Sequence, residues 1–315
     1  MALRVVVVMG GPSEEHDVSC RSGQGVVEAL ARCQWIVESL LIPRAAGVDE
    51  ALERARDGLT RARADVVFIA LHGLFGEDGT IQQLCEELHL PYTGSDVLAS
   101  RLGMDKVASK RRFEEAGLRV PRWRVIEGSR TEALRDLEGL AYPLVVKPAR
   151  SGSSFGVSIV ERADGMAAAI AQARRYGSTV LAEEFIAGRE LTVGILGDTP
   201  LPVIEIRPRQ GFFDFQAKYT QGATDYLVPA PIADDVAAAV QAAGLAAHRA
   251  LGCRHLSRAD LILDVRNTPM LLEVNTIPGF TPTSLLPKAA ACLQLSYDEL
   301  CERLALMACH ETAIS

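Results

Sequence analysis

Runs of apolar residues that end in glycines mark the first part of the chain. Residues 4–9 contain four consecutive valines, and Gly10 and Gly11 follow them directly. A continuous apolar run of this length is typical of a short strand that is buried on both faces, as in a parallel sheet. Residues 18–33 then carry apolar side chains at helical spacing, so a strand, a glycine turn and a helix are predicted in that order.

The same pattern recurs further along the chain. Residues 65–71 form a second apolar run, and a glycine-rich turn follows at 72–79. Strands that alternate with helices in this way predict a parallel α/β domain, which we expect to span residues 1–94. In such domains ligands bind beyond the carboxyl ends of the strands, which is where Glu15 and His72 fall.

The rest of the chain alternates between helical and extended patterns. At roughly 150 residues per domain, a chain of 315 residues is expected to form two or three domains. We expect the second and third at 95–182 and 183–315. The elements predicted there are helices at 106–116 and 232–251, strands at 142–147, 191–196, 259–264 and 270–275, a loop of small residues at 148–156, and a polar segment at 207–229.

Composition and charge narrow the classes of function. Hydrophobic residues make up 48% of the chain and charged residues 23%, a balance typical of a globular protein. The net charge is −7 without a basic patch, so no nucleic-acid partner is expected. Seven cysteines without C-x-x-C spacing predict reduced thiols rather than a zinc site or a disulfide framework. No apolar run is long enough to span a membrane, and we therefore expect a cytoplasmic protein.

Two polar strand segments near the C-terminus carry the strongest chemical signal. Only a short turn separates the strands that contain Arg258 with Asp260 and Glu273 with Asn275, so a hairpin is predicted. Residues two apart on a strand share a face, and the hairpin would bring Asp260, Glu273 and Asn275 together. Two carboxylates and an amide oxygen are ligands that suit Mg²⁺ beside phosphates. Polar residues on a solvated face are the simpler alternative.

A lysine and a loop of small residues form a second candidate. Lys147 ends a predicted buried strand, and the loop at 151–156 reads SGSSFG. Backbone N–H groups of such a loop can approach phosphate oxygens while an ammonium balances their charge. The order differs from a Walker A loop, because the lysine precedes the glycines. Of the 33 basic residues only five are lysines, at 106, 110, 147, 218 and 288. These positions could need a compact charge, although an arginine-rich genome produces the same bias. A Gly/Ser loop can also be only a turn.

Other polar residues give weaker signals. Glu183, Phe185 and Ile186 follow an apolar run and could meet an adenine, with Glu190 at a ribose, but from the residues alone a charged strand end is the favoured explanation. Glu15 can simply balance a helix dipole, and His72 can be an ordinary turn residue.

In order along the chain, these segments resemble the D-alanine–D-alanine ligases of the ATP-grasp superfamily. The resemblance extends from residue 5 to about residue 287. The matching motifs are GGPSEEHDVS at 10–19, ALHGLFGEDGT at 70–80, PYTGSD at 91–96, MDK at 104–106, VVKPARSGSSFG at 145–156, AKYTQGATDY at 217–226 with PAP at 229–231, SRADLILD at 257–264 and LLEVNTIPGFTPTSLLP at 271–287. The resemblance implies an ATP-grasp fold of the α/β and α+β class, in which an N-terminal parallel α/β domain precedes two domains that enclose ATP.

The resemblance also implies roles for individual residues. The implied contacts to the ATP phosphates come from Lys106, Lys147, Ser154 and Lys218. The implied contacts to the adenine come from Glu183, Phe185 and Ile186, and Glu190 is implied to bind the ribose. The implied ligands of two Mg²⁺ or Mn²⁺ ions are Asp260, Glu273 and Asn275. The implied catalytic and substrate residues are Glu15 with Ser153 and Tyr219 at the first D-alanine, His72 near its carboxylate, Arg258 and the Gly279 N–H at the oxyanion, and Ser284 and Leu285 at the second substrate's carboxylate.

The implied reaction joins two D-alanine molecules through an acyl phosphate, with ATP as co-substrate, for peptidoglycan precursor synthesis. The segment 207–229 would act as a lid that carries Lys218 and Tyr219, and a homodimer is expected. Two alternatives stay open: a related ligase that uses D-lactate or D-serine as the second substrate, and a nucleotide-binding regulatory protein without turnover. The positions that depart from the family pattern are Gln83, Ile159, Gln216 and His255, which put loop packing and rate in question.

Overall fold

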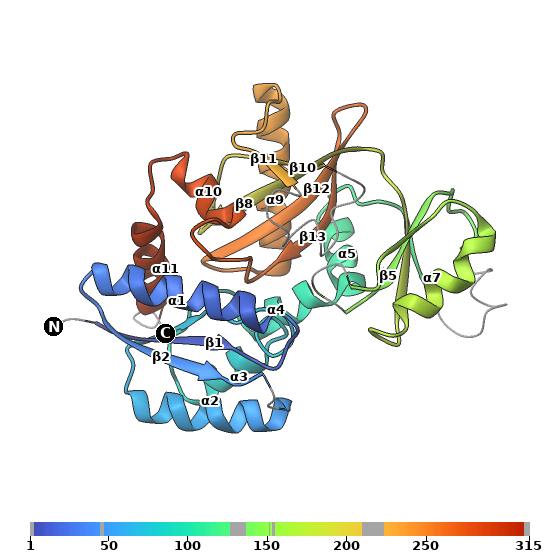
Figure 1. The fold of residues 1–315 in the computed structure, drawn as a ribbon. Coiled ribbons are helices and arrows are strands. Elements are labelled where there is room, and N and C mark those ends of the chain that lie inside the picture. Colours follow the sequence, from blue (N-terminus) through green and yellow to red (C-terminus); the bar gives the residue numbers. More distant parts are fainter. Residues whose placement is uncertain are drawn as a thin grey trace.

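The computed structural model describes residues 3–44, 47–126, 137–150, 152, 155–209 and 224–311. The described residues form three sheets, which follow one another along the chain (Figure 1). The first is parallel and the other two are antiparallel, as the predicted combination of α/β and α+β requires. No described helix is both long and apolar enough to cross a membrane. All seven cysteines are described, and none forms a disulfide.

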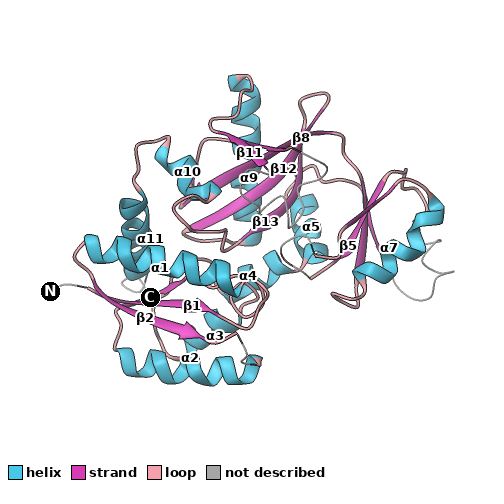
Figure 2. Cartoon of the chain, viewed as in Figure 1, coloured by secondary structure: helices cyan, strands magenta, loops and turns pink. Residues whose placement is uncertain are grey.

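The first sheet has the order β2-β1-β3 and is covered by helices on both faces (Figure 2). The valines of β1 explain this arrangement. Val5 and Val7 pack in one core with α1, whereas Val6 and Val8 pack in another with α2 and α3, so alternate side chains serve opposite faces. The elements are β1 (Arg4–Gly10), α1 (His16–Arg32), β2 (Ile36–Ile42), α2 (Val48–Ala62), β3 (Val66–Ile69) and α3 (Thr80–Glu87).

The second sheet has the order β4-β7-β5-β6. The 3-10 helix η1 (Ala163–Gly165) and α7 (Met166–Ala173) follow β6, and α7 contributes Met166 and Ile170 to the core of this sheet. The strands are β4 (Trp123–Ile126), β5 (Leu144–Pro148), β6 (Ser158–Val160) and β7 (Val180–Glu184). Strand β7 runs across the predicted boundary between residues 182 and 183, and the three-domain division stays a prediction.

The third sheet has the order β11-β10-β8-β12-β13, with β9 paired to β8. Helix α9 covers one face, where Val240 and Ala247 pack in one core with Val193 and Ala259 of the strands. The elements are β8 (Gly188–Leu196), β9 (Thr199–Pro200), β10 (Ile204–Pro208), β11 (Thr224–Leu227), α9 (Asp234–Leu251), β12 (Leu256–Asp264) and β13 (Pro269–Asn275).

Four further helices of the described residues connect these layers. Helix α5 lies between β13 of the third sheet and β5 of the second (Figure 1). The Asp105 carboxylate caps its N-terminus by accepting from the N–H groups of Val107 and Ala108, at 3.0 Å each. The last helix, α11, returns to the first sheet, where Leu300 and Leu304 share a core with Val5. These helices are α4 (Val97–Met104), α5 (Lys106–Glu115), α10 (Leu285–Ala291) and α11 (Tyr297–Glu311).

Candidate functional site

The predicted hairpin forms between β12 and β13, and its register determines which side chains lie next to each other. Asp260 lies opposite Glu273, and Arg258 lies opposite Asn275. Directly opposite residues in an antiparallel pair have neighbouring side chains on one face. The prediction that the two polar strand segments converge is therefore confirmed. We call Arg258, Asp260, Glu273 and Asn275, together with Lys106, the hairpin cluster.

Asp260 is held on several sides. Arg258 donates from Nε to Oδ1 at 2.8 Å and from Nη2 to Oδ2 at 2.6 Å. The Thr192 hydroxyl of β8 donates to Oδ1 at 2.6 Å, and Asn275 Nδ2 donates to Oδ2 at 3.1 Å. Thr192 was not identified from the sequence, because only the pairing of β8 with β12 brings it opposite Asp260.

Glu273 has a cationic neighbour from another element. Lys106, the first residue of α5, places Nζ 3.3 Å from Glu273 Oε2. Two carboxylates that face each other across a hairpin repel unless cations balance them, and here an arginine and a lysine are beside them. Among the described residues no three His, Cys, Asp or Glu side chains form a metal-ligand group. A hard cation here would take two carboxylates and an amide oxygen, a donor set that fits Mg²⁺.

A second charged group is buried in the neighbouring sheet. Lys147 of β5 forms an ion pair with Glu183 Oε1 of β7, and Lys110 Nζ of α5 lies 2.8 Å from Glu183 Oε2. Burial opposes charge on Glu183, but the two lysines outweigh it and lower the pKa of Glu183. Burial likewise lowers the pKa of Lys110, against the attraction of Glu183. We call Lys110, Lys147 and Glu183 the buried triad.

Lys110 was given no role by reasoning from the sequence. Two signals were available: it is one of only five lysines, and it lies four residues after Lys106, so the two share a face of α5. Which partners that face meets depends on how α5 packs between the sheets.

Glu15 lies among three loops at the carboxyl end of β1. A Cβ on Gly73 would be 3.0 Å from Glu15 Oε2, and a Cβ on Gly152 would be 3.1 Å from it. The Glu15 carboxylate therefore abuts both the turn after His72 and the glycine of the small-residue loop. Ser13 fixes the first of these contacts, because its hydroxyl donates to His72 O at 2.6 Å.

His72 is buried and connects the first sheet to the loop after β13. Its Nδ1 is 3.3 Å from Ile277 O, and its Nε2 is 3.0 Å from Ser22 Oγ. Burial opposes a charge on His72, but Glu77, with Oε1 3.8 Å from Nδ1, and Glu15 outweigh it, so the pKa of His72 is raised. Burial raises the pKa of Glu77 as well. Glu77 was overlooked in the sequence, although it belongs to the motif that contains His72.

The remaining predicted residues lie on loops and strand ends. Phe185 is exposed just after β7, and its N–H donates to Pro143 O at 2.9 Å; Ile186 is half-buried beside it. Glu190 is half-buried in β8. Ser284 occupies the N-cap position of α10 without a side-chain capping hydrogen bond, and Leu285 is the first residue of the helix. A Cβ on Gly279 would be 3.4 Å from Ser284 Oγ. The roles predicted for Ser153, Ser154, Lys218 and Tyr219 fall outside the described residues.

Comparison with known families decides which group this chain belongs to. The family model described as D-ala D-ala ligase C-terminus matches residues 112–305, and the one described as D-ala D-ala ligase N-terminus matches residues 43–95. The chain belongs to the D-alanine–D-alanine ligase family. Its fold is the ATP-grasp fold of these ligases.

Relatives support this membership over the full length. The D-alanine–D-alanine ligase of Syntrophotalea carbinolica is 46% identical over 304 residues, which cover 96% of this chain and 94% of the relative. That of Nitrosomonas europaea is 41% identical and covers 97% of both chains. The crystal structure of the ligase from Bacillus anthracis complexed with ATP superimposes with a TM-score of 0.82 at 31% identity, over 99% of both chains. The D-Ala:D-Ser ligase VanG from Enterococcus faecalis superimposes with 0.84 at 30% identity, over 98% of this chain and 100% of that one.

The residues that depart from the ligase family pattern lie in different surroundings. His255 is buried with φ of 56°, and its Nδ1 accepts the Gly94 N–H at 3.1 Å, so it joins the end of the first segment to β12. Gln83 accepts from Arg101 Nη2 at 2.8 Å on the surface. Gln216 lies outside the described residues.

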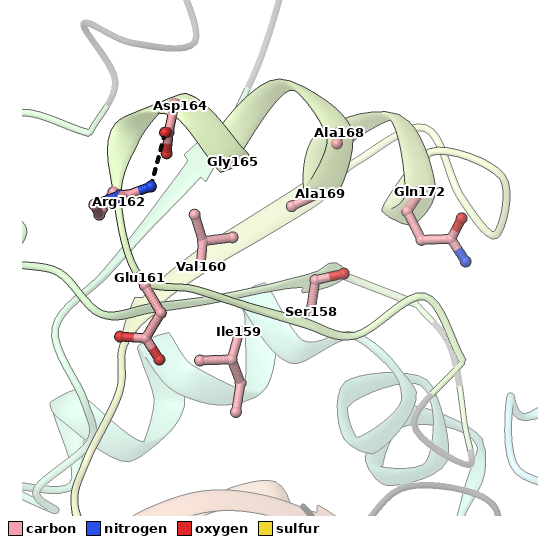
Figure 3. Close-up of a pocket in the computed structure, with 10 residues that line it drawn as sticks. All are labelled: Ser158, Ile159, Val160, Glu161, Arg162, Asp164, Gly165, Ala168, Ala169 and Gln172. Atoms are coloured by element: carbon pink, nitrogen blue, oxygen red, sulfur yellow. Dashed lines mark hydrogen bonds and ion pairs between the residues drawn. The ribbon is translucent and has the colours of Figure 1, made fainter.

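Ile159 lines a cavity of about 740 Å³ between β6, η1 and α7 (Figure 3). Figure 3 shows Val160 pointing toward α7 and Ile159 pointing away from it. None of the residues that line this cavity belongs to the hairpin cluster or the buried triad, so the cavity is separate from the site that the family resemblance implies. Its lining residues are Ser158, Ile159, Val160, Glu161, Arg162, Asp164, Gly165, Ala168, Ala169 and Gln172.

Proposed function

We propose that this chain joins two D-alanine molecules to D-alanyl-D-alanine, with cleavage of ATP to ADP and phosphate, for peptidoglycan precursor synthesis. The observation that carries the proposal is the hairpin cluster, in which Asp260 and Glu273 lie opposite each other and Lys106 Nζ is 3.3 Å from Glu273. The residues of this cluster match the family motifs in a chain whose ligase relatives cover it almost completely. We expect the enzyme to act in the cytoplasm and as a homodimer.

The nucleotide would lie between the second and third sheets. Lys106 and Lys147 belong to different layers, and their ammonium groups would balance the charge of the phosphates from two sides. Lys218 and the loop around Ser153 and Ser154 would add to this on closure. Glu183, Phe185 and Ile186, at the end of β7, would frame the adenine, and Glu190 would accept from the ribose hydroxyls.

Asp260, Glu273 and Asn275 would hold the divalent cations. Bound Mg²⁺ ions neutralise phosphate charge and so lower the barrier to transfer of the γ-phosphoryl group. The residues themselves fit this role because two carboxylates converge with an amide on one face of the hairpin. Arg258, which now neutralises Asp260, would then be released toward the reacting carbonyl.

The substrates would bind between the first sheet and the loop after β13. Glu15 would accept hydrogen bonds from the ammonium of the first D-alanine, in a network with Ser153 and Tyr219. His72 would lie near that substrate's carboxylate. Ser284 and Leu285, at the start of α10, would receive the carboxylate of the second D-alanine.

The chemistry would then proceed in two steps. The carboxylate of the first D-alanine attacks the γ-phosphorus of ATP, which forms an acyl phosphate and releases ADP. The amine of the second D-alanine attacks that carbonyl, and the tetrahedral intermediate expels phosphate as the peptide bond forms. Arg258 and the Gly279 N–H would stabilise the oxyanion in the second step. Most of the rate enhancement would come from positioning and charge balance.

A phosphate-release assay with acceptor analysis tests the proposal. The purified protein is given ATP, magnesium chloride and D-alanine, and we expect phosphate release that depends on D-alanine together with formation of the dipeptide. Binding of ATP without phosphate release would instead support a regulatory protein.

The second substrate is the finer part of the proposal. The likeness to VanG extends to the whole fold, so the fold does not distinguish D-alanine from D-serine. The higher identity to D-alanine–D-alanine ligases favours D-alanine. Competition among D-alanine, D-serine and D-lactate at neutral pH tests this choice, and a mixed product with D-serine or D-lactate as the main outcome would overturn it.

A further inference from the structure

The buried triad combines residues from three elements. Glu183 of β7 pairs with Val145 of β5, and Lys147 of β5 pairs with Leu181 of β7, so Glu183 and Lys147 are diagonal neighbours on one face of the sheet. Helix α5 contributes Lys110 from above this face, and each oxygen of the Glu183 carboxylate has its own lysine. The exposed fractions of the side chains are 0% for Lys110, 3% for Glu183 and 8% for Lys147.

Burial of three charged groups is not explained by stability alone. The cost of removing charges from water is large, and apolar side chains of similar size often serve a fold equally well. A single lysine would be enough to pair with Glu183. The second lysine changes the net charge instead: a Lys147–Glu183 pair is neutral, whereas the buried triad carries one net positive charge.

The position of α5 connects this charge to the hairpin cluster. Lys106 and Lys110 are one helical turn apart. Lys106 reaches Glu273 of the third sheet, and Lys110 reaches Glu183 of the second. Figure 1 shows α5 between these two sheets, so one helix contacts an acidic residue in each half of the proposed nucleotide site.

We propose that Lys110 is a positioning residue for nucleotide phosphates: it occupies one oxygen of Glu183, so that Glu183 can orient Lys147 without cancelling the positive charge that Lys147 offers to the phosphates. Lys110 is too deeply buried to contact a ligand itself. It acts through Glu183 and Lys147. This inference rests on the proposed function only in taking a nucleotide as the ligand.

The test compares ADP with adenosine, because the two share the base and ribose and differ in the phosphates. Lys110→Met keeps an unbranched side chain and makes the triad neutral. We expect the affinity for ADP in magnesium chloride to fall about tenfold, while the affinity for adenosine stays the same. Isothermal titration calorimetry, with adenosine measured by competition, gives both values. Arg112→Met on the same helix, which removes an exposed cation beside Glu115, is the matched control and should change neither.

A double variant separates charge from packing. Lys110→Met with Glu183→Gln removes both buried partners but leaves the single positive charge of Lys147, so the ratio of ADP to adenosine affinity should return to the wild-type value. If Lys110→Met alone does not fold, Lys110→Gln, which also makes the triad neutral, replaces it in the comparison of ADP with adenosine. A wild-type ratio in Lys110→Met, an equal loss for both ligands, or a reduced ratio in the double variant would overturn the inference. Binding requires no turnover, so a protein that binds ADP but makes no dipeptide would contradict the proposed function and leave this inference standing.

Discussion

The hairpin cluster and the buried triad each pair a lysine of α5 with a glutamate of a strand, but the two pairs differ in exposure. In the hairpin cluster the side chain of Glu273 is 27% exposed and that of Lys106 is 13% exposed. In the buried triad the corresponding values are 3% for Glu183 and 0% for Lys110. Water and ligands can therefore reach the first group, whereas in the second group Lys110 and Glu183 are almost completely buried and only Lys147, at 8% exposed, retains some access.

This difference determines what each group can do. An accessible ion pair is worth little and is easily exchanged, so Lys106 and Glu273 can part to accept phosphate and a cation. A buried pair is costly to break because each partner would be left as an uncompensated charge. This difference supports the proposed roles, in which the hairpin cluster binds ligands and Lys110 and Glu183 hold Lys147 in place.

The largest effect is expected from Glu273→Gln in the hairpin cluster. This variant keeps the size of the side chain and removes the charge that a cation requires, so D-alanine-dependent ADP release should fall about 1000-fold or more. The fold should be retained because Glu273 is partly exposed. Activity is measured with a coupled ADP assay and folding by urea unfolding. Turnover near the wild-type rate would show that Glu273 is not a metal ligand.

The reverse pattern is expected for Glu183→Gln in the buried triad. It leaves Lys110 and Lys147 close together without a carboxylate, so the free energy of unfolding should fall by about 3 kcal/mol. The matched control is Glu87→Gln, which breaks the exposed ion pair with Arg56 and should leave the unfolding midpoint unchanged. Urea denaturation of both variants measures the contrast. Equal midpoints would mean that burial does not distinguish the two kinds of pair.

A smaller effect is expected at His248, where burial acts without an ion pair. Its Nδ1 is 2.7 Å from the Ser257 hydroxyl, and burial lowers its pKa from 6.5 to about 4. The unfolded chain therefore takes up a proton first as pH falls, so the stability that His248 contributes is complete above pH 6.5 and is lost toward pH 4. Between pH 7.5 and 5 the loss should be about 2 kcal/mol larger in the wild type than in His248→Gln.

Urea unfolding of both proteins at the two pH values measures this difference. Acidic residues elsewhere titrate in both proteins, so their effect cancels in the comparison. Parallel pH dependences would show that His248 is not held in its neutral form.

The sequence predicted the parts of the site that depend on local spacing. The hairpin at 258–275 was predictable because strand periodicity places Arg258 and Asp260 on one face and a short turn brings the next strand back beside them. Buried strand β1 was predictable because four valines in a row cannot face water on either side. The role of Lys110 was not predictable, because its partner Glu183 is 73 residues away and the contact depends on how α5 packs.

By itself, the sequence determined the family, the order of the main elements and the residue types in each motif. Each of these depends only on residues that are close together along the chain. Only the tertiary structure decided that α11 packs against the first sheet and that His72 contacts the loop after β13. It also decided that lysines on one face of α5 pair with glutamates of two different sheets. The physical reason is that the periodicity of a helix or strand determines which face of that element each side chain occupies. What covers that face depends on the packing of the whole molecule.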